Sequence, residues 1–158
     1  MKLDIDLTEI NKIVDEFMYE YMSAIVDSGH SATGNLGLKQ KKRIRYNDRS
    51  FDVYLQLQPY WKYLENGTKP HFPPISALIK WIEVKPIIPT AKNGKLPTTK
   101  QLAYAIANKI SKVGTKPTHL LEQTKTNYKL EDKLTQALTD AITTKLNELL
   151  ESIWNGKI

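Results

Sequence analysis

The chain has 158 residues, of which 41% are hydrophobic and 25% are charged, and its net charge is +6. These values predict one soluble globular domain spanning residues 1–158. The absence of cysteine excludes disulfides and thiolate metal sites. No apolar run approaches the roughly 18 residues of a membrane span, and the N-terminus lacks the apolar core of a signal peptide. We therefore expect the chain to stay in the compartment where it is made, without a membrane partner.

The charge is divided along the chain. Residues 1–29 carry seven acidic and two basic side chains, net −5, and residues 130–158 carry five acidic and three basic, net −2. Residues 30–129 carry eighteen basic and five acidic side chains, net +13. Such a basic middle can face nucleic acid or the acidic ends of a neighbouring copy, or it can be a solvated lysine-rich surface.

The first predicted element is an amphipathic helix over residues 8 to 28. Its apolar residues recur at i, i+3, i+4 and i+7, namely Ile10, Ile13, Val14, Phe17, Met18, Tyr21, Met22 and Ile25. Asp6 or Thr8 can cap its start, and Gly29 can end it. A loop over residues 30–38 follows.

Residues 41 to 58 are predicted to form a β-hairpin with one buried face. Apolar residues from Phe51 to Leu57 alternate with polar or aromatic ones, and residues 42–46 alternate in the same way. Asn47-Asp48 supplies the turn. Residues 60 to 65 are expected to add a further strand to this small antiparallel sheet.

Two corners of the same sequence, Gly-Thr-Lys-Pro, occur at residues 67–70 and 114–117. A glycine adopts positive φ without steric cost, and a proline biases the residue before it toward extended geometry. The two segments therefore predict two sharp corners of one design.

Short helices and a long loop are expected between the two corners. Pro73-Pro74 opens one helix, and Thr98 with Gln101 forms a capping box at the start of a second, which Gly114 ends. Residues 84–100, rich in proline and lysine, are predicted to form a mobile loop. A long helix over residues 130 to 153 closes the chain. Its predicted core stripe consists of Leu130, Leu134, Leu138, Ala141, Ile142, Leu146, Leu149, Leu150 and Ile153.

No set of residues predicts an active site, a metal site or a cofactor site. The histidines, His30, His71 and His119, are 41 and 48 residues apart, and no carboxylate cluster accompanies them. The glycine–lysine pairs lack the order of a phosphate-binding loop. Glu65 precedes the first corner and is expected to form a salt bridge or to bind turn amides. A hydrolase or nuclease using Glu65, His71 and His119 is the remote alternative.

A basic patch lies on the predicted hairpin and the residues around it. It consists of Lys39, Lys41, Lys42, Arg43, Arg45 and Arg49. Such a patch can follow phosphates without reading sequence, and nearby tyrosines and a tryptophan can stack on bases. Aromatic residues on a half-exposed sheet are equally typical of protein interfaces.

The order of motifs resembles the tail-completion or head–tail joining proteins of tailed bacteriophages. The resemblance rests on Thr33-Gly34-Asn35-Leu36, on residues 60–63 followed by Leu64-Glu65-Asn66-Gly67-Thr68-Lys69-Pro70, on residues 74–81, and on residues 105–107 leading to Gly114-Thr115-Lys116-Pro117. It spans roughly residues 5 to 150. The chain departs from the family pattern after Pro117, where Thr118-His119 stands in place of an aromatic residue.

The resemblance implies an α+β subunit with its sheet flanked by long N- and C-terminal helices. It also implies a homo-oligomeric ring around the DNA path in the neck or tail of a virion, assembled in the host bacterial cytoplasm. The partners would be further copies, other neck, portal-adaptor or tail proteins, and non-specifically passing DNA. On this interpretation the corner residues define the fold and do not catalyse: Tyr63, Glu65, Gly67, Thr68, Pro70, Gly114 and Pro117.

The favoured hypothesis is therefore a non-enzymatic structural protein that forms a ring. Acidic helices of one subunit would meet the basic middle of the next. The alternative is a sequence-independent nucleic-acid-binding module that uses the basic patch.

Overall fold

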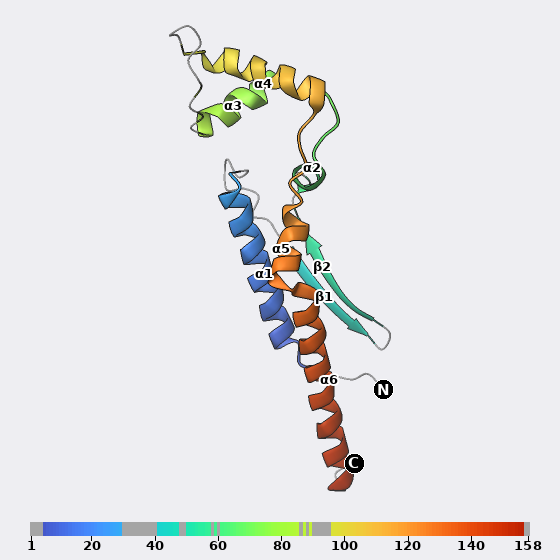
Figure 1. The fold of residues 1–158 in the computed structure, drawn as a ribbon. Coiled ribbons are helices and arrows are strands. Elements are labelled where there is room, and N and C mark those ends of the chain that lie inside the picture. The colour runs from blue at the N-terminus through green and yellow to red at the C-terminus, as the bar shows by residue number, and fades with distance from the viewer. Residues whose placement is uncertain are drawn as a thin grey trace. The chain divides into compact units, whose positions relative to one another are not determined.

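The computed structural model describes residues 5–29, 41–47, 50–57, 59, 61–85, 87, 89 and 96–156. Within these residues the fold is α+β, with six helices and a two-stranded antiparallel sheet (Figure 1). The elements in chain order are α1 (Thr8–Asp27), β1 (Lys41–Asn47), β2 (Ser50–Gln56), α2 (Trp61–Asn66), α3 (Ile75–Val84), α4 (Thr99–Val113), α5 (Leu120–Tyr128) and α6 (Leu130–Trp154). The predicted fold class, a small sheet with long N- and C-terminal helices, is confirmed.

The chain divides into two compact units. The first comprises residues 1–24, 40–57 and 121–158, and therefore holds most of α1, the hairpin and α6. The second comprises residues 25–39 and 58–120, with α2, α3 and α4. The expectation of a single domain stays a prediction.

The first unit contains the predicted hairpin. Strands β1 and β2 pair in antiparallel register, with Lys41 opposite Gln56 and Asn47 opposite Ser50. The Asn47 side chain closes the end of the ladder, because its Oδ1 accepts from the Ser50 amide at 3.0 Å. The turn residues Asp48 and Arg49 lie outside the described residues.

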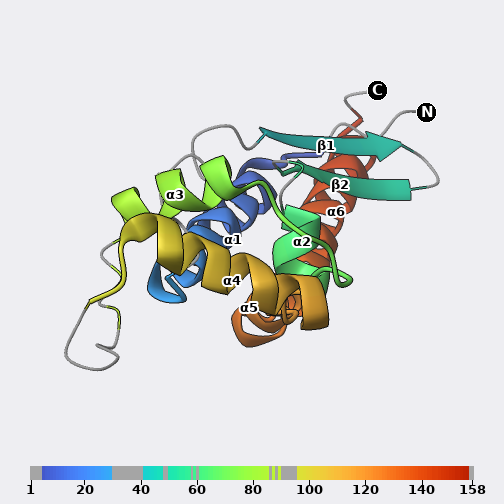
Figure 2. The ribbon, with the colours of Figure 1, turned by 90° about the horizontal axis from the view of Figure 1, so that it is seen from above.

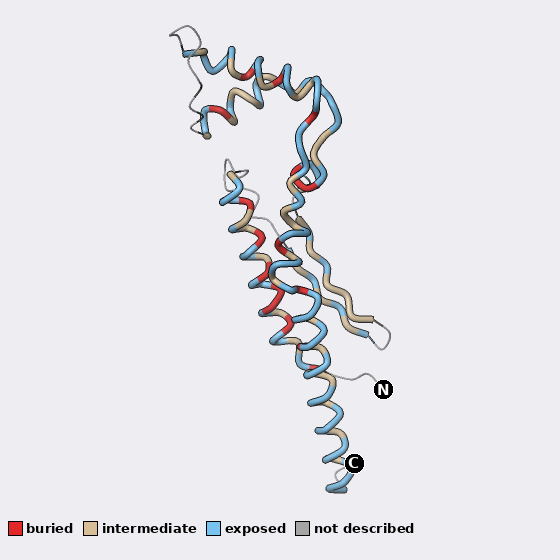
Figure 3. Tube along the Cα trace, viewed as in Figure 1, coloured by how far each residue is buried: buried red, intermediate tan, exposed pale blue. Residues whose placement is uncertain are grey.

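Apolar side chains of α1, α6 and the inner face of the hairpin form the core of the first unit. Its buried members are Ile10, Ile13, Phe17, Leu130 and Ala137, with Leu7, Ile44, Phe51, Leu55, Leu121, Tyr128, Leu134 and Leu138 packed against them. Buried positions recur along α1, whereas the C-terminal half of α6 is exposed or half-buried (Figure 3). The apolar stripe predicted for α1 is confirmed, as is the first half of the one predicted for α6, and the hydrophobic effect on both holds the hairpin against the helices.

The predicted ends of α1 are also confirmed. Asp6 caps the start, because its Oδ1 accepts from the Thr8 amide at 2.8 Å and from the Thr8 hydroxyl at 2.6 Å. Gly29 follows the end with φ +70°, and its amide donates to the Val26 carbonyl at 2.9 Å. Without these hydrogen bonds, backbone donors at the start of α1 and backbone acceptors at its end would lack partners.

Helices α3 and α4 pack side by side in the second unit (Figure 2). Ala103 and Ala107 on α4 and Ile82 on α3 are buried, and the small alanines allow a close approach of the two helices. The capping box is present, with the Gln101 amide donating to Thr98 Oγ1 at 3.3 Å and the Thr98 amide donating to Gln101 Oε1 at 2.9 Å. Of the expected 84–100 loop, residues 86, 88 and 90–95 lie outside the described residues, whereas Val84 ends α3 and Thr99 and Lys100 begin α4.

One sequence-based expectation was wrong: residues 61–66 form helix α2 and not a further strand. Leu64 and Glu65 are adjacent in sequence and both buried, which a helix allows, whereas a strand would direct them to opposite faces. Residues 60–65 are too few to show a helical period. The prediction of a strand therefore relied on the β-propensity of their aromatic residues, which was misleading. Helix α5 was not anticipated either.

The two Gly-Thr-Lys-Pro corners pair with one another. Thr68 and Thr115 form an antiparallel bridge, in which the Thr68 amide donates to the Thr115 carbonyl at 3.2 Å and the Thr115 amide donates to the Thr68 carbonyl at 3.3 Å. Their hydroxyls lie 3.0 Å apart. The corners are therefore two halves of one structure that joins residues 47 positions apart.

Further hydrogen bonds extend the pairing on both sides. The Thr118 amide and hydroxyl donate to the Leu64 carbonyl at 3.0 and 2.7 Å. In the mirrored position, the His71 amide donates to the Ile110 carbonyl at 3.4 Å. Residues four places after each glycine thus bind the helix that precedes the other glycine, which gives the paired corners an approximate two-fold pattern.

Glycine is required at both corners for two reasons. Gly67 and Gly114 have φ of +68° and +69°, which side chains disfavour. In addition, a Cβ on Gly67 would collide with the Thr115 carbonyl oxygen, and a Cβ on Gly114 with the Thr68 carbonyl oxygen. Each glycine packs directly on the threonine backbone of the other corner.

We predict that Gly67→Ala and Gly114→Ala each lower the free energy of unfolding by more than about 3 kcal/mol, since backbone overlap adds to the positive-φ strain. Gly29→Ala is the matched control. Its φ is also positive, but a Cβ there would meet only the flexible end of Lys85 at 3.3 Å. The control should cost about 1 kcal/mol. Urea denaturation followed by circular dichroism measures all three, and equal losses would contradict a steric role for the corners.

A second prediction concerns pH and the first unit. The Tyr128 hydroxyl donates to Glu16 Oε2 at 2.7 Å. Burial, then the hydrogen bond to Glu16 and the nearby carboxylates, raises the pKa of Tyr128 to about 12. The unfolded chain has a tyrosine pKa of about 10, so this contribution to stability is present below pH 10 and lost as the pH rises toward 12.

Tyr128→Phe should therefore be less stable than the wild type at pH 8, by about 1 kcal/mol. The difference should shrink as the pH rises from 10 to 12, because only the wild type loses the bond by titration. Urea denaturation at pH 8, 10 and 11.5 measures the difference. A gap that stays constant across this range would show that the hydroxyl does not titrate in the folded state as described.

Candidate interaction surfaces

The alternation of β1 divides the predicted basic patch between two faces of the hairpin. Lys41, Arg43 and Arg45 are exposed, whereas Lys42, between them, is half-buried. The exposed three lie opposite Gln56, Tyr54 and Asp52 of β2, respectively. These six residues form a surface that we call the outer hairpin face.

The outer hairpin face combines positive charge with an aromatic ring. The Arg45 guanidinium lies 5.5 Å from the centre of the Tyr54 ring, which is half exposed. Within the described residues, Lys41, Arg43 and Arg45 form no salt bridge. A cationic surface with one exposed ring is suited to an anionic partner, either a carboxylate-rich protein surface or phosphates. Lys39 and Arg49, the other members of the predicted patch, lie outside the described residues.

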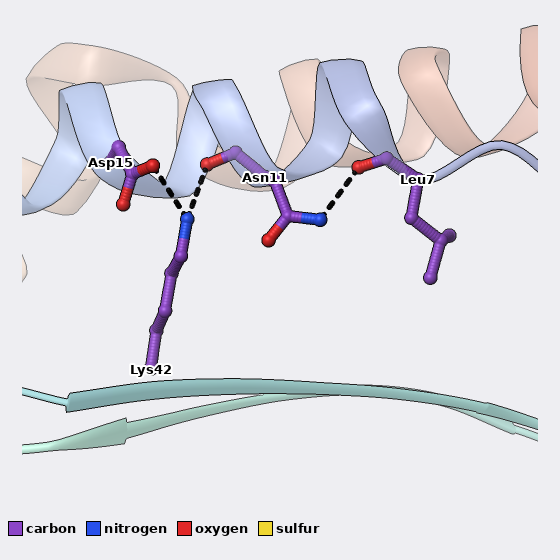
Figure 4. A network of polar contacts seen from close by, with 4 residues as sticks. All are labelled: Leu7, Asn11, Asp15 and Lys42. Carbon is purple, nitrogen blue, oxygen red and sulfur yellow. Dashed lines mark hydrogen bonds and ion pairs between the residues drawn. The ribbon is translucent and has the colours of Figure 1, made fainter.

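Lys42 has a structural role and does not belong to this surface. Its Nζ lies 2.6 Å from Asp15 Oδ2 and donates to the Asn11 carbonyl at 3.0 Å (Figure 4). The Asn11 side chain in turn donates to the Leu7 carbonyl at 2.9 Å. The side chain of Lys42 thereby connects β1 with α1 over the core of the first unit.

This division predicts that substitutions of two neighbouring lysines differ in their effect on stability. Lys42→Met keeps the aliphatic stem but removes the ion pair and should cost about 1 kcal/mol of unfolding free energy. Lys41→Met, one residue away on the outer face, should change stability by less than about 0.5 kcal/mol. Thermal and urea denaturation measure both. A Lys41 variant that is as destabilised as the Lys42 variant would contradict the assignment of the two faces.

An acidic groove lies between the start of α1 and the middle of α6. It is an open hollow of about 540 Å³. Four carboxylates line it: Asp6, Glu9, Asp140 and Glu148. Ile5, Ala137 and Ala141 supply its apolar part, and Ile5 and Ala137 are buried. Both elements belong to the first unit, and none of the described hairpin residues lines the groove.

The groove keeps a negative charge although two lysines neutralise it in part. The hydrogen bonds from the Thr8 hydroxyl and amide hold the pKa of Asp6 below its usual range, so this carboxylate stays charged at neutral pH. Lys145, which also lines the groove, lies 3.1 Å from Glu148, and Lys12 lies 3.5 Å from Glu9. The Lys12–Glu9 pair is largely exposed on both sides, and such pairs are weak in water.

A separate apolar stripe lies on the last turns of α6. Leu146, Leu150, Ile153 and Trp154 are exposed there, and Trp154 has 91% of its surface free. At 100° per residue, this stripe lies on the opposite side of α6 from the groove. The sequence placed Leu146, Leu150 and Ile153 in the core stripe, but the structure shows that these three side chains are exposed.

The predicted corner residues lie together in the second unit. Gly67, Thr68 and Gly114 form the pairing described above, and Glu65 is buried with its carbonyl accepting from the His119 amide at 3.3 Å. Tyr63, Pro70 and Pro117 are exposed.

The remote hydrolase hypothesis includes His71 and His119, and the ring of His71 contacts the backbone. The His71 ring Nδ1 lies 2.9 Å from the Lys69 carbonyl oxygen, and both His71 and His119 are exposed. In the part of the chain that the structure describes, no three acidic, histidine or cysteine side chains gather in a way that could hold a metal ion. His30 lies outside this part.

The groove was missed by sequence reasoning. Its residues come from two segments more than 120 positions apart, each acidic but unremarkable by itself. The only available signal was the net negative charge of both chain ends, which predicts no shape. Packing of α1 against α6 converts two acidic helix faces into one hollow.

Comparison with known protein families, with characterised proteins and with solved structures yields no match to this chain. The phage resemblance therefore rests on the short motifs quoted above. None of the described helices combines the length and the apolarity needed to cross a membrane.

Proposed function

We propose that this chain is a non-enzymatic structural protein of a tailed-phage virion, a head–tail joining or tail-completion subunit that forms a ring around the DNA path. The mutual pairing of the Gly-Thr-Lys-Pro corners carries the proposal. Both corners belong to the motifs on which the phage resemblance rests, and their threonines and glycines are used to join backbone segments.

The surfaces of the first unit support the same proposal. A cationic face and an anionic groove on one compact unit are complementary between copies, and a subunit with two different complementary surfaces can propagate into a ring. The proposed partners are further copies, other neck, portal-adaptor or tail proteins, and passing DNA without sequence preference. The proposed location is the neck or tail of the virion.

The proposal is tested by the mass and the shape of the purified protein. Size-exclusion chromatography with light scattering should give a mass several times the 18.1 kDa of one chain. Negative-stain imaging should show closed rings with a central opening, whereas open helical filaments would show that the repeated contact does not close.

One outcome would count against the ring and favour the second candidate, a sequence-independent nucleic-acid-binding module. This is a strict monomer that does not join tail or portal components but binds duplex DNA with a steep salt dependence. The Arg45–Tyr54 contact on the outer hairpin face is the observation that favours this candidate. In that case Arg43→Glu with Arg45→Glu should abolish DNA binding.

A further inference from the structure

We infer that the outer hairpin face of one copy docks in the acidic groove of the next copy, and that this contact propagates the ring. The inference rests on the proposed ring function and names its interface. Lys41, Arg43 and Arg45 bring three positive charges beside the single carboxylate of Asp52, and the groove brings four carboxylates with Lys145 among them. The two surfaces are therefore opposite in net charge.

The spacing of the charges also agrees. Lys41 and Arg45 are four strand residues apart, which spans about 13 Å at 3.3 Å per residue. Asp140 and Glu148 are eight helical residues apart, which spans about 12 Å at 1.5 Å per residue. A strand laid along α6 can therefore place a cation near each end of the carboxylate row at the same time.

The groove has an apolar part that can contact the ring of Tyr54. Ala137 and Ala141 are small, and with Ile5 they line the hollow together with the carboxylates. Tyr54 is half exposed and stands beside Arg43 and Arg45 on the same face. An aromatic anchor beside arginines is typical of the energetic centre of an interface.

The lysines that neutralise the groove do not block this contact. Lys145 and Lys12 bind by a single ammonium group, and their pairs with Glu148 and Glu9 leave the carboxylates 59% and 64% exposed. An arginine can bind a carboxylate through two parallel hydrogen bonds, and it loses less hydration than an ammonium group does. Arginines of a neighbouring copy can therefore bind these carboxylates beside or in place of the lysines.

The two surfaces cannot satisfy each other within one chain. The inner face of the hairpin packs on the core through Ile44, Phe51 and Leu55, so the outer face points away from the helices that form the groove. The contact is therefore head-to-tail, and a bound pair of copies still offers one free groove at one end and one free face at the other. Repetition of the contact gives a closed ring when its rotation returns to the first copy.

The test uses charge reversal on each side of the contact in the full chain. The face variant is Arg43→Glu with Arg45→Glu, and the groove variant is Glu9→Lys with Asp140→Lys. All four residues are exposed, and Lys42 is left intact because it holds the hairpin. The matched control is Lys109→Glu with Lys112→Glu, which makes the same charge change as the face variant on exposed positions of α4. Circular dichroism and thermal melting verify that each variant folds.

Each variant alone should assemble at least about 100-fold more weakly than the wild type, because like charges then meet at the contact. An equimolar mixture should recover the assembled mass, because the reversed face of one variant complements the reversed groove of the other. The control should assemble like the wild type. Light scattering and sedimentation velocity measure the masses.

Four other outcomes would each contradict the inference, and the experiments distinguish them. If the wild type and both variants form the same rings, the contact is wrong while the ring function stands. If the variants are monomeric and the mixture does not recover, the two surfaces do not meet. If the face variant keeps its mass but loses DNA binding, the outer hairpin face is a nucleic-acid surface. If the wild type is monomeric even at millimolar concentration, the inference and the proposed ring fail together.

Discussion

The close approach of two backbone segments at the paired corners is the constraint on which the second unit depends. Gly67 and Gly114 each leave room for the carbonyl oxygen of the opposite threonine, and the bridge between Thr68 and Thr115 then fixes the register. Joining these segments closes a loop of 47 residues that contains α3 and α4. The entropy lost on closing such a loop must be offset locally, and the hydrogen bonds from Thr118 and His71 to the preceding helices contribute to that.

The first unit is held by a different kind of interaction. The apolar stripes of α1 and α6 and the inner face of the hairpin exclude water together, and polar contacts such as Lys42 with Asp15 orient the hairpin on α1. The polar residues of this unit therefore separate into two groups. Those on the inner side complete the packing, whereas the outer hairpin face and the acidic groove are available to other molecules.

A division of labour between the units follows. In the second unit, the two Gly-Thr-Lys-Pro corners determine the backbone geometry. The first unit presents opposite charges on two surfaces that cannot meet within one chain. This combination supports the proposed assembly function, because assembly needs rigid elements and complementary surfaces. The exposed apolar stripe on the last turns of α6 is a further surface of the same unit.

The sequence by itself determined the periodic elements: α1, α6, the hairpin, the capped start of α4, and the glycine ends of α1 and α4. Periodicity, capping and turn chemistry are local properties, so they can be recognised in the sequence without knowledge of the tertiary structure. Only the tertiary structure decided that residues 61–66 are helical, that Lys42 leaves the basic patch, that the two corners pair, and that α1 and α6 enclose a groove. Each of these depends on which distant residues come together, because burial, register and close approach are properties of pairs of segments that neither segment encodes alone.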